Sequence, residues 1–261
     1  MICGSLAENV NNLSVCEGLV HGEATVSQEA TGLVIETFGR HVTVLTADGQ
    51  QLICHPRGKK NLAVVGDRVQ WSTTADQGTI EKVLPRDNLF FRQDEMRTKS
   101  FAANLDHILI FLGAEPEFSE MQLSRALIAA EATGINVTIA LNKRDLTALH
   151  ARSWARLQPY RDMGVDVVGL SLVTEPPTGI DELNERLRGR TTLVLGPSGA
   201  GKSTLINHLI PAVDLRTQEI SRALNSGKHT TTACRYFDLP EWSRNQAHLG
   251  GLIDSPGFQE F

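Results

Sequence analysis

The chain has 261 residues, of which 41% are hydrophobic and 21% are charged, and its formal net charge at pH 7 is −5. This composition indicates an ordinary globular protein, long enough for a sizeable core and two domains. The acidic balance excludes attraction of the whole surface to nucleic acid but leaves room for a local basic face.

Two further classes of protein are disfavoured by the sequence. No apolar run approaches the ~20 residues of a membrane-spanning helix, and Met1 to Gly32 lacks the basic start and apolar stretch of a signal peptide. We therefore expect a cytoplasmic protein without a membrane partner. The four cysteines show no C-x-x-C spacing, so they predict neither a disulfide framework nor a zinc site; they are Cys3, Cys16, Cys54 and Cys234.

The N-terminal third of the chain predicts a tail followed by a small β-barrel. Residues 1–30 are polar and aperiodic, which is typical of a flexible tail. Residues 31–85 contain five short β-rich runs, and Asp48-Gly49 between two of them is a strong hairpin signal. Five strands in so short a stretch favour an OB-fold. The runs are Gly32 to Glu36, His41 to Thr46, Gln50 to Cys54, Asp67 to Trp71, and Gly78 to Leu84.

A basic loop lies between two of these strands. Arg57, Lys59 and Lys60 place three cations there, where contact with RNA phosphates is a candidate role and a solvated loop is the plain alternative. The polar segment that follows, Arg86 to Ser100, has no clear period. We expect residues 86–103 to be the linker between two domains.

From Asn104 the pattern alternates strand and helix, which predicts an α/β doubly wound, mostly parallel sheet over residues 104–261. Ligands bind such sheets at the carboxyl ends of the strands. The expected strands are His107 to Leu112, Val137 to Leu141, Val165 to Leu170, and Thr192 to Leu195. The expected helices are Gln122 to Thr133, Ala148 to Met163, Ile180 to Leu187, and Thr204 to Ile210.

One stretch of this domain matches the phosphate-loop pattern G-x-x-x-x-G-K-[ST] between a strand and a helix. Its glycines let backbone N–H groups face a di- or triphosphate, its lysine can reach the outer phosphates, and its serine can bind Mg²⁺. The plain alternative is a glycine-rich turn. The stretch is Gly196, Pro197, Ser198, Gly199, Ala200, Gly201, Lys202, Ser203 and Thr204.

A second motif specifies the base. Asn142-Lys143-Arg144-Asp145 follows a strand and matches N-K-x-D. A carboxylate at Asp145 can accept from guanine N1–H and its N2 amine, whereas adenine lacks that donor pair. Lys143 can lie against the base, and Asn142 can brace the phosphate loop. Ser171, at the end of the next strand, is a candidate second contact to guanine.

Two more segments complete a GTPase set. Asp254-Ser-Pro-Gly257 matches D-x-x-G, in which Asp254 would hold Mg²⁺ through water and the Gly257 N–H would sense the γ-phosphate. The long loop Val213 to Ala233 occupies the place of switch I, and we expect its Thr231 to close on Mg²⁺ and the γ-phosphate.

The order of these motifs is rotated, because N-K-x-D precedes the phosphate loop. Circular permutation accounts for this order without changing the site in space. The series of motifs resembles the ribosome small subunit-dependent GTPase A (RsgA) family over about residues 31–261, including Val65-Gly-Asp-Arg-Val69 and Leu215-Arg-Thr-Gln-Glu-Ile-Ser221.

This resemblance implies a late assembly factor that binds the 30S ribosomal subunit and its 16S rRNA, partly through the OB-fold. It implies GTP as substrate, GDP as product, Mg²⁺ as cofactor, subunit-stimulated hydrolysis and a monomer. Phe258 stands where a water-orienting glutamine is found in Ras-like proteins, so we expect slow intrinsic turnover. The resemblance implies that His229 is the catalytic substitute; a solvated loop residue is the alternative.

Family members also carry a Cys/His zinc domain after D-x-x-G. The sequence ends at Phe261, so zinc ligands cannot be assigned in it. Two other functions stay open at this point. An ATP-using P-loop enzyme would leave N-K-R-D without a role, and an RNA-binding nucleotide switch without efficient hydrolysis would be consistent with Phe258.

Overall fold

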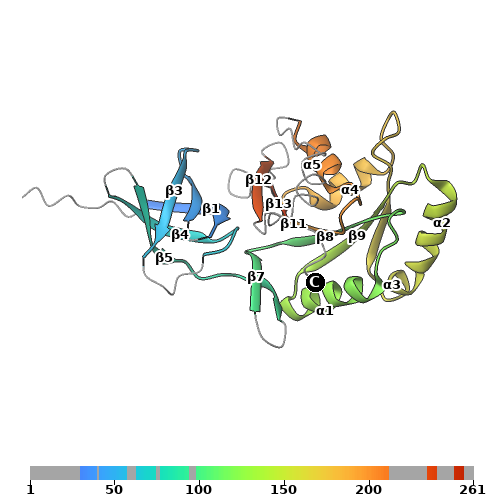
Figure 1. The fold of residues 1–261 in the computed structure, drawn as a ribbon, viewed down its shortest axis with the longest axis horizontal. Coiled ribbons are helices and arrows are strands. Elements are labelled where there is room, and N and C mark those ends of the chain that lie inside the picture. The colour runs from blue at the N-terminus through green and yellow to red at the C-terminus, as the bar shows by residue number, and fades with distance from the viewer. Residues whose placement is uncertain are drawn as a thin grey trace, which may run out of the picture.

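A computed structural model of the chain describes residues 30–39, 41–57, 63–74, 77–93, 98–211, 234–239 and 250–255. The described strands form one 11-stranded sheet and a separate two-stranded sheet. The larger sheet runs from a small barrel into an α/β domain, so a single sheet joins the two parts of the chain (Figure 1).

The barrel confirms the predicted OB-like fold. Its strands follow the order β1-β2-β3-β5-β4, and pairing of β4 with β1 closes the circle. Alternating apolar residues such as Val34, Val44 and Ile80 fill the interior. At the predicted hairpin, Gly49 takes a φ of 82°. The strands are β1 (Ala30–Phe38), β2 (His41–Thr46), β3 (Gln51–Pro56), β4 (Arg68–Thr74) and β5 (Gln77–Val83).

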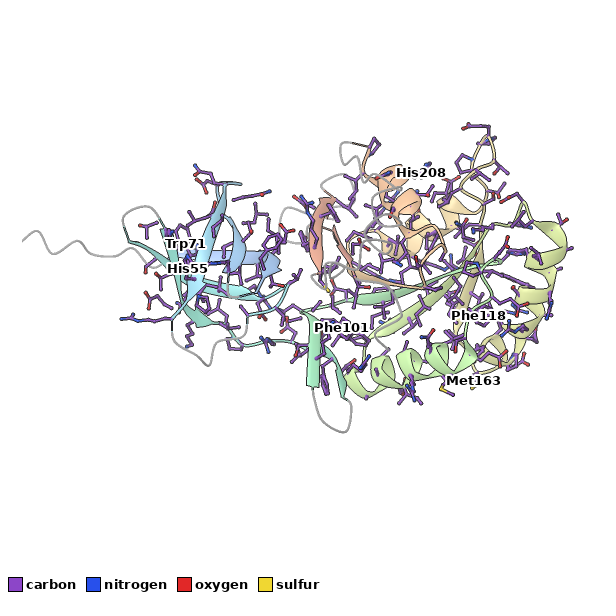
Figure 2. The ribbon with its side chains drawn as sticks, viewed as in Figure 1. His55, Trp71, Phe101, Phe118, Met163 and His208 are labelled. Atoms are coloured by element: carbon purple, nitrogen blue, oxygen red, sulfur yellow. The ribbon has the colours of Figure 1, made fainter. Side chains whose placement is uncertain are left out.

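The segment expected to be the linker, residues 86–103, contains a packed hairpin that its lack of a clear period did not indicate. Strands β6 (Leu89–Gln93) and β7 (Thr98–Ala103) pair antiparallel. Phe90 and Phe101 are buried with ring centroids 6.0 Å apart, and Phe101 lies between the barrel and the α/β domain (Figure 2). The polar composition hid the hairpin because only a few large apolar side chains anchor it.

A buried ion pair fixes the barrel to this hairpin. The side chain of Asp67 is fully buried, and Arg86 donates to both of its carboxylate oxygens, at 2.7 and 2.8 Å. The Val64 N–H donates to the same carboxylate at 2.8 Å. A buried carboxylate is tolerated only with such partners.

The α/β domain confirms the predicted mostly parallel sheet. Its strand order is β10-β9-β8-β11-β13-β12, and within it only β12 runs antiparallel to its neighbour. The sequence interpretation missed β12. The strands are β8 (His107–Gly113), β9 (Asn136–Asn142), β10 (Asp166–Gly169), β11 (Thr191–Leu195), β12 (Arg235–Leu239) and β13 (Gly250–Asp254).

Helices cover both faces of this sheet. Helices α1 (Glu120–Thr133) and α3 (Gln158–Asp162) bury residues in one hydrophobic cluster, and α4 (Ile180–Leu187) and α5 (Lys202–Leu209) bury theirs in another (Figure 1). The single helix expected over Ala148 to Met163 is in fact α2 (Thr147–Arg156) followed by α3. Pro159 in the first turn of α3 lacks the N–H that a continuous helix needs. Within the described part of the chain, every helix is too short or too polar to cross a bilayer.

The Asp67–Arg86 pair generates a stability prediction. Arg86→Met leaves Asp67 buried without its cation and should lower the free energy of unfolding by about 3 kcal/mol. Arg68→Met removes the exposed partner of Asp87 and should cost less than about 1 kcal/mol. Chemical denaturation of both variants measures the difference, and equal losses would contradict the assignment.

Candidate nucleotide-binding site

The predicted site residues gather at one edge of the sheet. β9 ends at Asn142, β11 at Leu195 and β13 at Asp254. These strands and β8 run parallel, and their registers pair Gly113 with Asn142 and Val194 with Asp254. The motifs that follow the strands therefore emerge side by side, although the chain presents them in rotated order.

The phosphate loop connects β11 to α5 and needs its glycines. Gly199 and Gly201 have φ values of 80° and 101°, which L side chains rarely adopt. A Cβ on Gly196 would lie 2.0 Å from the Phe111 carbonyl oxygen, so the loop must pass close to β8. The backbone is thus shaped to present its N–H groups at the start of a helix, as anion binding requires.

Asn142 joins the two motifs directly. Its Nδ2 donates to the Ala200 carbonyl of the phosphate loop over 3.0 Å, across 58 residues of sequence. A Cβ on Gly201 would lie 2.6 Å from that same nitrogen. Asn142 is buried, and its Oδ1 has no hydrogen-bond partner among the described residues. This amide therefore braces the loop while keeping a free acceptor.

Lys202 is folded back on its own loop. Its Nζ donates to the carbonyls of Gly196 at 2.7 Å and Pro197 at 3.2 Å. Burial lowers the pKa of the ammonium, and the nearby Asp254 carboxylate opposes that shift. A phosphate oxygen would offer this cation a stronger, charge-assisted partner than a carbonyl does.

Asp254 has the character of a cation ligand. Burial raises the pKa of its carboxyl to about 6, against the opposing effects of Lys202 and the Ser255 N–H. Its Oδ1 is buried without a hydrogen-bond partner among the described residues. A desolvated carboxylate oxygen without a donor suits a hard cation such as Mg²⁺. The Ser203 hydroxyl, in the first turn of α5, is the second candidate ligand.

The N-K-x-D segment is held in place by its neighbours. The Ser171 hydroxyl donates to Asp145 Oδ1 at 2.6 Å, and Ser171 is itself fixed by two 3.0 Å backbone hydrogen bonds with Thr178. Lys143 takes a φ of 67°, and its Nζ donates to the Glu115 carbonyl at 2.6 Å. The structure thus brings Asp145 and Ser171 together, as their proposed shared task requires.

One predicted contact residue does not share this edge, and five other predicted site residues fall outside the described part of the chain. Arg57 lies on the barrel and forms an ion pair with Glu81. Lys59, Lys60, His229, Thr231 and Gly257 lie outside the described residues. No cluster of three or more His, Cys, Asp or Glu residues with metal-site geometry occurs among the residues that are described.

Sequence reasoning missed the loop that follows β8. Its Glu115 carbonyl accepts from Lys143, and a Cβ on Gly113 would lie 3.3 Å from the Ala200 Cα. Pro116 lies 3.4 Å from the position of a Cβ on Gly199. The sequence did contain a signal for this loop, because the buried strand β8 ends in a glycine at the edge of the sheet where ligands bind.

Comparison with known proteins places these features in a family. The family model described as RsgA GTPase matches residues 83–261. A protein of Variovorax paradoxus (strain S110), named small ribosomal subunit biogenesis GTPase RsgA, is 60% identical over 230 residues. That match covers 88% of this chain and 71% of the relative.

Two solved structures are similar in fold. YjeQ from Thermotoga maritima matches with a TM-score of 0.62 and 29% identity, covering 89% of this chain and 76% of that one. YloQ, which is described as a circularly permuted GTPase, matches with a TM-score of 0.55 and 22% identity over 92% of this chain and 75% of its own. The second likeness concerns the fold alone, and it agrees with the rotated order of the motifs.

We expect the buried Asp254 carboxylate to lower the stability of the folded protein while it favours the binding of a cation. Its pKa of about 6 lies above the usual 3.8, so the ionised form destabilises the folded protein above pH 6 and this penalty disappears below about pH 4. Without nucleotide and Mg²⁺, Asp254→Asn should raise the free energy of unfolding at pH 8 by on the order of 1–2 kcal/mol.

The gain from Asp254→Asn should shrink as the pH falls to about 4. Thermal unfolding at both pH values measures it, with Asp162→Asn on the surface of α3 as the matched control. A lower melting temperature for Asp254→Asn at pH 8 would contradict the account.

Proposed function

This chain belongs to the RsgA GTPase family, and we propose that it binds GTP, hydrolyses it to GDP and phosphate, and acts in the biogenesis of the small ribosomal subunit. The observation that carries the proposal is the hydrogen bond between Asn142 and Ala200, which places the N-K-x-D motif against the phosphate loop. A single nucleotide can then touch both motifs.

Asp145 and Ser171 account for base recognition. The Asp145 carboxylate can accept from N1–H and the N2 amine of guanine, and Ser171 holds the carboxylate in orientation through Oδ1. Adenine presents an acceptor and a C–H at these positions, which would leave the carboxylate unpaired. Such a mismatch rejects the wrong base by several kcal/mol. The aliphatic stem of Lys143 would lie along the base, and Arg144 continues the motif.

The phosphate loop accounts for phosphate binding. Residues Gly196 to Thr204 supply backbone N–H groups, and Lys202 would exchange its two carbonyl partners for oxygens of the outer phosphates. Ser203 and Asp254 would hold Mg²⁺, Asp254 through a water molecule. When bound, Mg²⁺ neutralises charge on the transferring phosphoryl group.

The groups that act on the attacking water are proposed from the family resemblance. Phe258 cannot hydrogen-bond to water, so intrinsic turnover should be slow, and His229 is the proposed substitute. Thr231 and Gly257 would close on the γ-phosphate, and Thr231 would also bind Mg²⁺. Docking on the subunit would bring His229 into place.

The small ribosomal subunit is the proposed partner. The relative's name supports this assignment. The OB-like barrel would contact 16S rRNA through Arg57, Lys59 and Lys60, since cations on such a loop pair with phosphates. We further propose a cytoplasmic monomer. Zinc is expected in the family, but no ligands for it can be assigned in this sequence.

Base specificity is directly testable. Asp145→Asn replaces an acceptor with an amide donor, so the affinity for GDP should fall at least about 100-fold. Xanthosine diphosphate, which carries a carbonyl in place of the N2 amine, should bind better to the variant than GDP does. Competition binding with GDP, xanthosine diphosphate and ADP measures this, with Asp162→Asn as control. Displacement of GDP by ADP from the unmodified protein would instead support an ATP-using enzyme.

GTP turnover with and without 30S subunits tests the function itself. The proposal expects slow turnover alone and a rise of at least about 10-fold with subunits, and His229→Ala should remove most of that rise. GDP binding by His229→Ala should stay unchanged. Turnover that never responds to subunits would favour the RNA-binding switch, and full stimulation of the variant would reject the role of His229.

A further inference from the structure

A row of residues paired across neighbouring strands connects the barrel to Asp254, the candidate metal carboxylate. Strand β1 of the barrel pairs antiparallel with β12, where Glu36 lies opposite Arg235. On its other side, Arg235 of β12 lies opposite Asp254 of β13. Neighbouring strands lie about 4.8 Å apart, so Glu36 is only about 10 Å from Asp254 along this row.

A bulge in β1 directs one barrel residue towards the α/β domain. The register of β1 on β2 pairs Val34 with Val44 and then Glu36 with Thr43, which leaves Ile35 as the extra residue. Val34 is buried in the core of the barrel, whereas Ile35 is buried in the main cluster of the α/β domain. Ile35 is therefore a barrel residue that packs in the core of its neighbour.

The cluster that contains Ile35 also includes one side chain from β12, one from β13 and one from the residue before β12. It contains Cys234, Tyr236 and Ile253. Tyr236 lies tightly over β13, because a Cβ on Gly251 would come within 2.2 Å of its hydroxyl oxygen. Ile35 therefore shares one hydrophobic cluster with side chains of β12 and of the strand that carries Asp254.

We propose that Ile35 is a positioning residue through which the barrel sets the position of Asp254 and thereby the binding of Mg²⁺. The inference rests on the proposed function, because it assigns a means of regulation to that same nucleotide site. A displacement of the barrel, such as one caused by contact with RNA, would change the position of Asp254 through β12.

Asp254 is suited to this control because one of its two carboxylate oxygens is not held by a neighbouring donor in the described part of the chain. Its Oδ1 has no hydrogen-bond partner among the described residues, so β13 sets its position. On one side β13 is held by β11, where the Ser255 hydroxyl donates to the Val194 carbonyl at 2.6 Å. On the other side it is held by β12. Mg²⁺ demands near-ideal octahedral geometry, so a small displacement of β12 weakens its binding.

The junction between the barrel and the segment after β7 is rigid, so a displacement of the barrel is passed on to the α/β domain. Asn104 Nδ2 donates to the Gly66 carbonyl at 2.8 Å, and the Ala103 N–H donates to Val65 at 2.9 Å. A Cβ on Gly66 would lie 2.2 Å from the Ala103 carbonyl oxygen, so the backbones are in close contact. Together with the Asp67–Arg86 pair, these contacts keep the barrel from turning freely.

Two matched series of variants test the proposal. Ile35→Val and Ile35→Ala remove groups from the shared core, and Ile80→Val and Ile80→Ala remove the same groups from the barrel's own core, where Ile80 is fully buried. For each variant, the dissociation rate of a fluorescent GDP analogue is measured over a range of Mg²⁺ concentrations. Thermal unfolding is recorded alongside.

The Mg²⁺ concentration that gives half of the full reduction in the GDP dissociation rate should rise about three- to tenfold in Ile35→Ala. The rise should be smaller in Ile35→Val. Release without Mg²⁺ should stay unchanged, and the Ile80 series should keep the Mg²⁺ requirement of the unmodified chain. If Ile35→Ala does not fold, Ile35→Val carries the test.

An unchanged Mg²⁺ requirement in folded Ile35 variants would overturn the proposal. An equal shift in the Ile80 series would also overturn it, because the effect would then follow barrel stability in general. Failure of the unmodified chain to bind the GDP analogue would reject the proposed function instead, so the two failures are distinguishable.

Discussion

The hydrogen bond from Asn142 to the Ala200 carbonyl is the contact on which the site depends. It ties the end of β9 to the loop after β11, and β8 between them holds both in register. Gly201 makes the approach possible, because any side chain there would meet the amide. A base site and a phosphate site are thereby held at a fixed separation, as recognition of one nucleotide requires.

Because the motifs occur in rotated order, β12 and β13 connect the nucleotide site to the barrel. Both strands lie between the phosphate-loop strand β11 and barrel strand β1 in the continuous sheet. In this arrangement the candidate metal carboxylate has the phosphate loop on one side and the barrel on the other. The buried ion pair of Asp67 and the bulge at Ile35 then have roles beyond the stability of the barrel, since they fix the geometry between the barrel and the candidate nucleotide site.

Local sequence pattern predicted much of the fold because these elements are determined by their own side chains. The apolar run of β8, the alternation in β2 and the turn at Asp48-Gly49 each predict one structure. Long-range pairing decided the rest. The hairpin of β6 and β7 is anchored by few large apolar side chains, and strand β12 pairs with β1 from the other end of the chain, so a local pattern did not indicate either of them.

The site, too, has features that the local sequence predicts and features that only the fold determines. The motifs predicted which residue types would meet, because phosphate and guanine impose their own donors and acceptors. They did not predict the Glu115 carbonyl that accepts from Lys143, since a carbonyl is present at every residue and only the fold selects one. Nor did they predict that Asp254 Oδ1 is buried without a hydrogen-bond partner among the described residues, which depends on the burial produced by β12 and β13.

The central claim is that one guanine nucleotide binds both Asn142 to Asp145 and Gly196 to Thr204. Hydrogen–deuterium exchange with increasing GDP in the presence of Mg²⁺ tests it most directly. The account predicts that both segments become protected with the same GDP midpoint and that ADP protects neither at those concentrations. Protection of the phosphate loop alone, or equal protection by ADP, would contradict it.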